Sequence, residues 1–354
     1  MTHRQARPAW VAAALALAVI AAACGNDGSP DVAGQAAPTT TDPGPREITV
    51  YSGRAESLVA PLLQQFTRDT GVKVNTRYAD SSALAAQLVE EGGGSPADVF
   101  FSQDAGALGA LSKRGLLAAS PAEAVSLVDG RFRAKDNTWV GVSGRARVIV
   151  HNPERVPASE VPRDIFAVTD PKWKGRVGIA PTNASFQSFV TGMRVKVGDA
   201  RTRQWLAGLK ANDPRIFNGN APIVAAVDEG QVDLGLVNHY YLYQRITTVG
   251  ADKVKARNAF TTNGDPGALV NIAGVGILRS TRAPAASATF VNYVLSPPAQ
   301  AYFAEKTFEY PMVAGVATAA DLPALTAIQS PDVDLSDLDT LETSLAMLRE
   351  VGLL

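Results

Sequence analysis

The sequence predicts an α/β protein of two lobes, each a mostly parallel sheet flanked by helices, with a cleft between the lobes. Three observations support this fold class. Short β-branched runs alternate with amphipathic helical segments, an order that favours parallel strands joined by helices. The alternation falls into two blocks, the second beginning near Trp139. No Gly-Ser linker separates the blocks, so we expect the chain to cross between the lobes as strands.

The first block consists of three strand–helix pairs. Leu58, Leu62 and Phe66 recur at helical spacing in its first helix. Gly71 marks the end of that helix. Ligands of parallel sheets bind beyond the carboxyl ends of the strands, so the loops at 52–56 and 102–104 are candidate ligand loops. The expected strands are 48–51, 72–78 and 98–101, and the expected helices are 57–71, 81–91 and 105–114.

The second block contains longer β-rich runs. Asn238 directly follows one of its strands, and it can cap a helix that starts at once. An amphipathic helix at 336–351 closes the chain, with Ser336 as its expected cap. The other expected strands are 139–152, 176–180, 232–237 and 270–278, and the other expected helices begin at Phe186 or cover 203–211, 223–229 and 283–295.

The N-terminus has the pattern of an export signal. Residues 1–8 are basic, and the next apolar run, from Trp10 to Ala23, has 14 residues. A run of that length is shorter than the roughly twenty residues that span a bilayer, and it is typical of a signal peptide. Cys24, the only cysteine, follows a stretch that resembles a lipobox, although Ala21 stands where leucine is usual. A lone cysteine cannot form an internal disulfide, so we expect lipid attachment; a secreted protein with a free thiol is the alternative.

Residues 25–46 are rich in Gly, Pro, Thr and Asp and have almost no large apolar side chains. Such a segment cannot bury enough surface to become ordered. We therefore expect a signal peptide at 1–23, a lipid-anchored disordered linker at 24–46, and an extracytoplasmic protein at the outer face of a membrane or in a periplasm. The net charge of −1 gives no reason to expect a nucleic-acid partner, and we expect membrane contact through the lipid only.

Eight stretches of the chain together resemble one known family. They are ITVYSGR (48–54), FTRDTGVKV (66–74), EEGGGSPADVFFSQDAGALGAL (90–111), SGRARVIV (143–150), KWKGRVGIAPTNASFQ (172–187), VDLGLVNHYY (232–241), GDPGAL (264–269) and EYPM (309–312). Through them the chain resembles the ferric-ion-binding proteins, the extracytoplasmic solute receptors of iron(III) ABC importers. The resemblance implies a monomer with the type II periplasmic-binding-protein fold, and a permease and an ATPase as partners. It implies an N-terminal lobe of 47–135 plus about 268–318 and a C-terminal lobe of 136–267 plus about 319–354.

Tyr240 and Tyr241 match the paired tyrosine ligands of that family. Fe³⁺ is a hard cation that prefers anionic oxygen donors, and a bound cation can deprotonate a phenol. Successive side chains at a helix start lie about 100° apart, so both phenols can reach one ion, and the helix N-terminus favours their negative charge. Adjacent tyrosines taken alone are more often surface or packing residues. We expect Tyr243, two residues further on, to be a packing residue.

Several family ligand positions differ in this chain. Ala55 stands where some members have histidine, and Gln103 stands where they have glutamate. Phe186 and Asn183 occupy tyrosine positions of other members. Only two clear protein ligands result, so the resemblance implies a synergistic anion such as carbonate, phosphate or citrate. Its expected cradle is Arg54, Asn183, Ala184, Ser185, Asn220 and Asn238, where a helix N-terminus and a planar guanidinium suit an anion.

Other polar residues are candidates for the cleft or for structural pairing. Gln103, Asp104 and Glu56 are possible cleft residues, and Arg145 and Arg147 are expected to pair structurally. The predicted function is capture of ferric iron and not catalysis, since the sequence lacks a Gly-x-Ser-x-Gly elbow, a Walker loop and an HExxH motif. A receptor of the same fold for an organic or oxyanion ligand without metal is the alternative, and a tethered enzyme is a weaker one.

Overall fold

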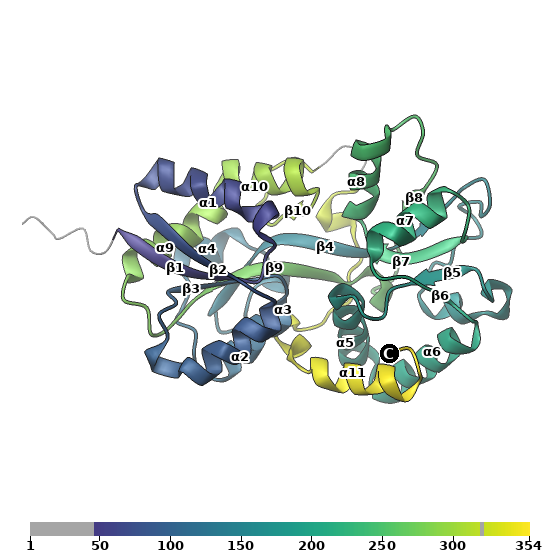
Figure 1. The fold of residues 1–354 in the computed structure, drawn as a ribbon, viewed down its shortest axis with the longest axis horizontal. Coiled ribbons are helices and arrows are strands. Elements are labelled where there is room, and N and C mark those ends of the chain that lie inside the picture. Colours follow the sequence, from purple (N-terminus) through teal and green to yellow (C-terminus); the bar gives the residue numbers. More distant parts are fainter. Residues whose placement is uncertain (1–45, 319–321) are drawn as a thin grey trace, which may run out of the picture. The chain divides into compact units, whose positions relative to one another are not determined.

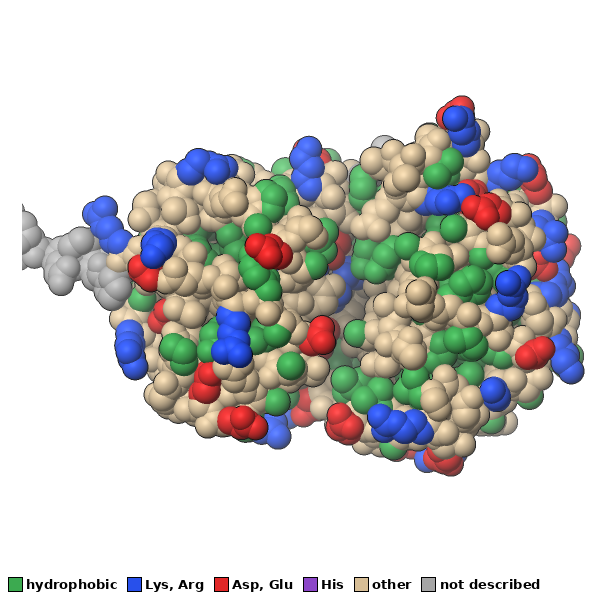
Figure 2. All heavy atoms as spheres, viewed as in Figure 1, with side chains coloured by type: hydrophobic (Ala, Val, Ile, Leu, Met, Phe, Trp, Pro, Cys, Tyr) green, Lys and Arg blue, Asp and Glu red, His purple; other side chains and the backbone are tan. Residues whose placement is uncertain are grey.

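The computed structural model describes residues 46–318 and 322–354. The expected signal peptide, Cys24 and the linker up to residue 45 lie outside this range. No helix among the described residues is both long enough and apolar enough to cross a bilayer. On the face shown in Figure 2, acidic and basic side chains are interspersed, and no large patch of one sign forms.

One sheet of ten strands runs through the described residues (Figure 1). Its strands are β1 (Glu47–Ser52), β2 (Lys73–Tyr78), β3 (Val99–Ser102), β4 (Trp139–His151), β5 (Val177–Ile179), β6 (Arg215–Ile216), β7 (Leu234–Asn238), β8 (Arg257–Ala259), β9 (Val270–Ile277) and β10 (Tyr310–Pro311). The order is β2-β1-β3-β9-β4-β7-β5-β6, and β8 and β10 both pair with β4. The outer strands of each half are parallel, and the central pairs β3–β9, β9–β4 and β4–β7 are antiparallel.

Most of the helices lie where the sequence periodicity predicts them. They are α1 (Glu56–Thr70), α2 (Ser81–Glu91), α3 (Ala105–Lys113), α4 (Ala122–Leu127), α5 (Ala184–Val197), α6 (Asp199–Ala211), α7 (Asn220–Asp228), α8 (Tyr240–Val249), α9 (Pro284–Val294), α10 (Pro297–Tyr302) and α11 (Leu341–Glu350). Short helical turns include η5 (Pro266–Ala268), the π-helix η6 (Phe303–Thr307) and η8 (Leu335–Asp339). Gly71 ends α1 as predicted: its φ of 72° is in the left-handed region, and its N–H bonds the carbonyl of Thr67.

Two lobes are defined by their cores. The first core packs α1, α3 and α9 around β1, β3 and β9, with Phe66, Phe101 and Phe290 in edge-to-face contact. The second lobe has one apolar cluster on each side of its strands. Strand β4 belongs to both lobes, because Val140 and Val142 pack in the first core whereas Ile149 and Val150 pack in the second lobe. The expectation that the chain crosses between the lobes as a strand is therefore confirmed for β4.

The C-terminal segment differs from the expected single helix at 336–351. It is split into η8 and α11, and Asp334 instead of Ser336 caps the first piece, accepting a bond from the Ser336 amide. The two pieces pack in different places: Leu338 lies in the first core, whereas Leu348 lies in the second lobe, and the helix is broken between them at Thr340. A Cβ added at Gly109 of α3 would lie 2.3 Å from the Ser336 carbonyl oxygen, so the close approach of η8 needs glycine there.

Candidate metal and anion site

A cavity of about 120 Å³ lies where the two lobes face each other, enough for several water-sized groups. Strand β4, the first turns of α5 and α8, the β3–α3 loop and β9 line it. A wider space of about 630 Å³ adjoins it and shares part of its wall. Figure 2 shows a hollow between the lobes on the face in view. The smaller cavity is lined by Gln103, Asp104, Arg145, Arg147, Asn183, Ala184, Ser185, Ser188, Phe189, Asn238, Tyr240, Tyr241, Leu269 and Asn271.

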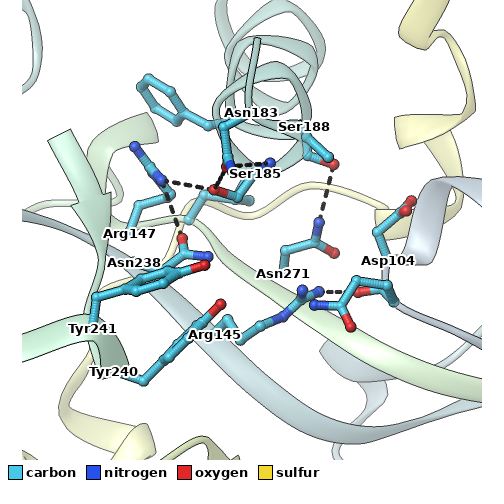
Figure 3. Close-up of a pocket in the computed structure, with 14 residues that line it drawn as sticks. Asp104, Arg145, Arg147, Asn183, Ser185, Ser188, Asn238, Tyr240, Tyr241 and Asn271 are labelled. Carbon is cyan, nitrogen blue, oxygen red and sulfur yellow. Dashed lines mark hydrogen bonds between the residues drawn. The ribbon is translucent and has the colours of Figure 1, made fainter. Parts of the chain in front are cut away.

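Tyr240 and Tyr241 form one wall of this cavity as the first two residues of α8. Their rings stack, with centroids 4.3 Å apart and planes 28° apart. Both phenolic oxygens point into the cavity (Figure 3). Burial is the main cause, and the neighbouring phenol of Tyr241 the second, of a pKa of Tyr240 well above its ordinary value. The phenol therefore stays neutral without a cation beside it. The expected cap at Asn238 is wrong: Asn238 is the last residue of β7, and the cap position belongs to His239.

Arg147 lies beside Asn238, on the same side of the cavity as the tyrosines (Figure 3), and is 4% exposed. Its Nη1 donates to Asn238 Oδ1 at 3.2 Å, Ser185 Oγ at 3.4 Å and Asn220 Oδ1 at 3.5 Å. Within residues 46–318 and 322–354 its Nη2 has no hydrogen-bond partner, and no carboxylate pairs with it. The guanidinium lies 5.2 Å from the ring centre of Phe189. Burial lowers its pKa to about 9, so it remains charged at neutral pH.

Arg145, two residues earlier on β4, faces the same cavity. Its Nη2 donates to the carbonyls of Gln103 and Ile272, and its Nε lies 4.0 Å from Glu309. The expectation that both arginines pair structurally therefore holds in part for Arg145, which approaches one carboxylate, and does not hold for Arg147, which has no carboxylate partner among the described residues. Both side chains reach the cavity because residues two apart on a strand lie on the same face, and this face of β4 opens into the cavity.

Arg54 does not line the cavity, contrary to the expectation that it cradles an anion. Its side chain is buried, and it forms a bidentate ion pair with Glu309 at 3.0 and 2.8 Å. Its Nη1 also donates to Gln103 Oε1 at 2.7 Å. Burial raises the pKa of Glu309, but Arg54 and Arg145 outweigh it, so the pKa is lowered on balance and the carboxylate is charged. Both planar groups of the pair are therefore already occupied.

The first turn of α5 forms a second wall, beginning two residues before the expected Phe186. Asn183 caps the helix by accepting from the amide and hydroxyl of Ser185, at 3.0 and 2.6 Å. Asn220 lies behind this turn and not on the cavity lining; it donates to Asn183 Oδ1 at 3.0 Å and accepts from the Asn238 amide at 3.1 Å. Ala184 and Ser185 thus present a helix N-terminus beside an incompletely bonded guanidinium, an arrangement that suits an anion.

The facing wall comes from the first lobe. Gln103 and Asp104 line it, as expected, and Asp104 caps α3 by accepting from the Ala107 amide at 3.2 Å. Burial raises the pKa of Asp104. Glu56 is not part of the wall, because it lies exposed in the first turn of α1.

Two polar lining residues, Asn271 and Ser188, were missed by the sequence analysis. Asn271 of β9 donates to Ser188 of α5 at 3.2 Å, and this bond joins two elements that line the cavity (Figure 3). In the sequence, Asn271 is the one polar residue within the apolar run 270–277, and that interruption is a signal that could have identified it. Within the described residues, no group of three or more His, Cys, Asp or Glu side chains could hold a metal ion.

Two lobes that share a strand and enclose a polar cavity define a two-lobed ligand-binding protein. A family described as bacterial extracellular solute-binding protein matches residues 94–338, and the chain belongs to this family. Over 87% of its length it is 31% identical to the Fe(3+)-binding periplasmic protein of Serratia marcescens, of which it covers 90%.

Solved structures agree with this assignment. Iron-bound HitA from Pseudomonas aeruginosa is 31% identical with a TM-score of 0.79, over 86% of this chain and 99% of that one. FutA (IdiA) from Trichodesmium, solved with iron and citrate ligands, is 29% identical with a TM-score of 0.76, over the same shares. These neighbours are type II periplasmic binding proteins, which confirms the predicted fold class. The relatives are transport and binding proteins and not enzymes.

Proposed function

We propose that this protein captures ferric iron together with an anion, with Tyr240 and Tyr241 as metal ligands. The observation that carries the proposal is the stacked pair of phenols that lines the same cavity as Arg147, a buried guanidinium with no acidic partner in the described part of the chain. The names of the relatives support it, since the Serratia protein is named for Fe(3+) binding and HitA was solved with iron bound.

The chemistry of the wall explains why the cargo would be iron with an anion. Two phenolates leave one positive charge on Fe³⁺ and several coordination positions open. Arg147 and Arg145 already give the cavity positive charge, so a bare trivalent cation would be repelled until an anion enters. The first turn of α5 and Arg147 would hold that anion, and Arg147 thereby takes the role that the sequence gave to Arg54. Carbonate, phosphate and citrate all have oxygens suited to this cradle, and the Trichodesmium structure contains citrate beside iron.

A titration of the iron-free protein with ferric salt tests the proposal. In the presence of carbonate, phosphate or citrate, we expect a visible phenolate-to-iron charge-transfer band that saturates at one iron per chain. Tyr240→Phe and Tyr241→Phe should each abolish the band or strongly reduce it, whereas Tyr243→Phe, a matched change on the same helix, should retain it. Absence of the band in the wild-type protein with all three anions would refute the assignment.

A receptor for an oxyanion or organic anion without metal is the second candidate. The Nη2 of Arg147, which has no hydrogen-bond partner among the described residues and lies beside a helix N-terminus, favours it, because these groups could hold an anion without iron. Calorimetry with each anion after treatment with an iron chelator separates the two candidates. Tight metal-free binding that survives Tyr240→Phe would favour the second, whereas weak binding strengthened by iron supports the first.

The delivery step is part of the same proposal. Lipid attachment at Cys24 would hold the protein at the outer face of a membrane, and a permease with its ATPase would accept the iron from the closed form. Family membership supports this role, because the family consists of extracellular solute-binding proteins.

A further inference from the structure

His239, the residue directly before the tyrosine pair, is buried and has both ring nitrogens bonded to backbone groups. Its side chain is 0% exposed. The Ala146 amide of β4 donates to Nδ1 at 3.1 Å. A backbone amide can only donate, so Nδ1 must be the acceptor and the ring proton must be on Nε2. Nε2–H then donates to the carbonyl of Phe308 at 2.8 Å, and the structure admits only this neutral tautomer.

The Phe308 carbonyl belongs to a segment that is packed against the first lobe. We call Phe308–Tyr310 the hinge segment. It follows the π-helix η6, and Phe308 has a φ of 58°, a left-handed backbone conformation that is uncommon for a residue with a side chain. Ring contacts also hold α8 and His239 against this segment. The ring centroids of His239 and Tyr310 are 4.7 Å apart, and those of Tyr243 and Phe308 are 6.0 Å apart.

The hinge segment is also linked, through Arg54, to the opposite wall of the cavity. Glu309 accepts from Arg54, from Ser143 at 2.7 Å and from Thr307 at 3.2 Å. Arg54 in turn donates to Gln103, which lines the cavity from the first lobe. A continuous chain of buried and partly buried bonds therefore runs from the first turn of α8, through His239 and the hinge segment, to the facing wall.

We infer that His239 is a positioning residue for iron capture: its bond to Phe308 fixes the first turn of α8, and hence the two phenolic oxygens, relative to the first lobe. This inference rests on the proposed function, since it concerns the same two tyrosines. His239 can affect both tyrosines because it occupies the N-cap position of α8. Tyr240 and Tyr241 are the next two residues, and a rotation of the helix start would move both oxygens together. The backbone of His239 is held as well, by the Ala146 carbonyl and by Asn258.

Two substitutions at His239 each retain one of its two ring-nitrogen hydrogen bonds and remove the other, so the two bonds can be tested one at a time. In His239→Asn the amide oxygen can replace Nδ1 and keep the Ala146 bond, but the side chain is too short to reach Phe308. In His239→Gln the amide nitrogen can replace Nε2 and keep the Phe308 bond, while the Ala146 amide loses its acceptor. Each variant loses one buried bond, so the urea midpoints of the iron-free variants should be similar. Tyr310→Phe is the control: the Tyr310 hydroxyl has no partner in the described residues, so its removal leaves the ring against His239.

The measurement is the rate at which a competing chelator removes iron, with the charge-transfer band as the signal. We expect His239→Asn to release iron about tenfold faster than wild type, the effect of one buried hydrogen bond, and to shift the band. His239→Gln and Tyr310→Phe should keep the wild-type band and release rate. Equal behaviour of the Asn and Gln variants, or a larger effect of Gln, would overturn the inference while the wild-type band still supports iron binding. A wild-type protein without the band would refute the proposed function itself.

A measurement on the unmodified protein covers the case in which the variants fail to fold. Nitrogen-15 NMR of histidine-labelled, iron-free protein should show one buried imidazole as the Nε2–H tautomer with slow hydrogen exchange. The Nδ1–H tautomer, or rapid exchange of that proton, would overturn the inference whatever the protein binds.

Discussion

Replacing Arg147 with methionine should strengthen the iron-free fold and weaken iron capture at the same time. Arg147 is a buried cation for which the described residues supply no carboxylate, and burial lowers its pKa from 12.5 to about 9. At about 1.36 kcal/mol per pKa unit, the charged form is disfavoured by about 5 kcal/mol relative to water. Methionine fills similar space and can rest against the ring of Phe189.

Two losses reduce this gain in stability. The contact of the guanidinium with Phe189 contributes about 1 kcal/mol, and an unpaired Asn238 Oδ1 costs about 1–2 kcal/mol. The net expectation is an increase of about 2 kcal/mol in the free energy of unfolding of the iron-free Arg147→Met variant, measured by urea denaturation. Iron affinity in the presence of the anion should fall about 10- to 150-fold, because a charge-assisted bond to the anion is lost.

Arg145→Met is the matched control on the same strand. Arg145 bonds two carbonyls and approaches Glu309, so its removal leaves buried acceptors unpaired and should destabilise the protein. If Arg147→Met also lowered the free energy of unfolding by 2 kcal/mol or more, Arg147 would be a structural residue. Iron affinity that is unchanged in Arg147→Met would refute its role in holding the anion.

Three further outcomes are expected. Glu309→Gln should lower the free energy of unfolding by about 3–5 kcal/mol in urea denaturation, because it leaves the buried charge of Arg54 unpaired; a change below about 1 kcal/mol would contradict the importance of this pair. His151 is buried and donates to the Val156 carbonyl at 2.9 Å, and burial lowers its pKa. Below about pH 6.5 the unfolded chain therefore binds more protons than the folded protein, so the free energy of unfolding should fall as the pH decreases. The His151→Gln variant should show a shallower fall in that range, and an equal slope would refute the reasoning. Cys24→Ala should move the exported protein from the membrane pellet to the supernatant in fractionation, and retention in the pellet would refute lipid attachment at Cys24.

Local patterns in the sequence were sufficient for many elements. The helix predicted at 81–91 is α2, residue for residue, because its apolar period and the glycines that follow it are local signals. The β-rich run at 139–152 is β4 within one residue, because a strand buried on both faces needs an unbroken run of suitable residues. The boundaries of α5 and η8 were less accurate, because caps and packing determine where a helix begins.

The partners of the buried charges could not be predicted in this way. Arg54 and Glu309 are 255 residues apart, and the sequence gives no indication that they meet. Arg147 has the same strand context as Arg145, yet only the fold shows that Glu309 approaches one of them and not the other. The structure therefore pairs Arg54, the expected cradle residue, with an acid and places Arg147, an expected structural residue, on the cavity lining.

By itself, the sequence determined the alternation of strands and helices, the adjacent phenols after a buried strand, and the resemblance to a receptor family. These features depend on residues that are neighbours along the chain. The tertiary structure decided which guanidinium faces the cavity without an acid beside it, and how His239 joins the tyrosines to the hinge segment. Charge pairing and burial depend on distances in space, which the order of the strands sets and no single segment encodes.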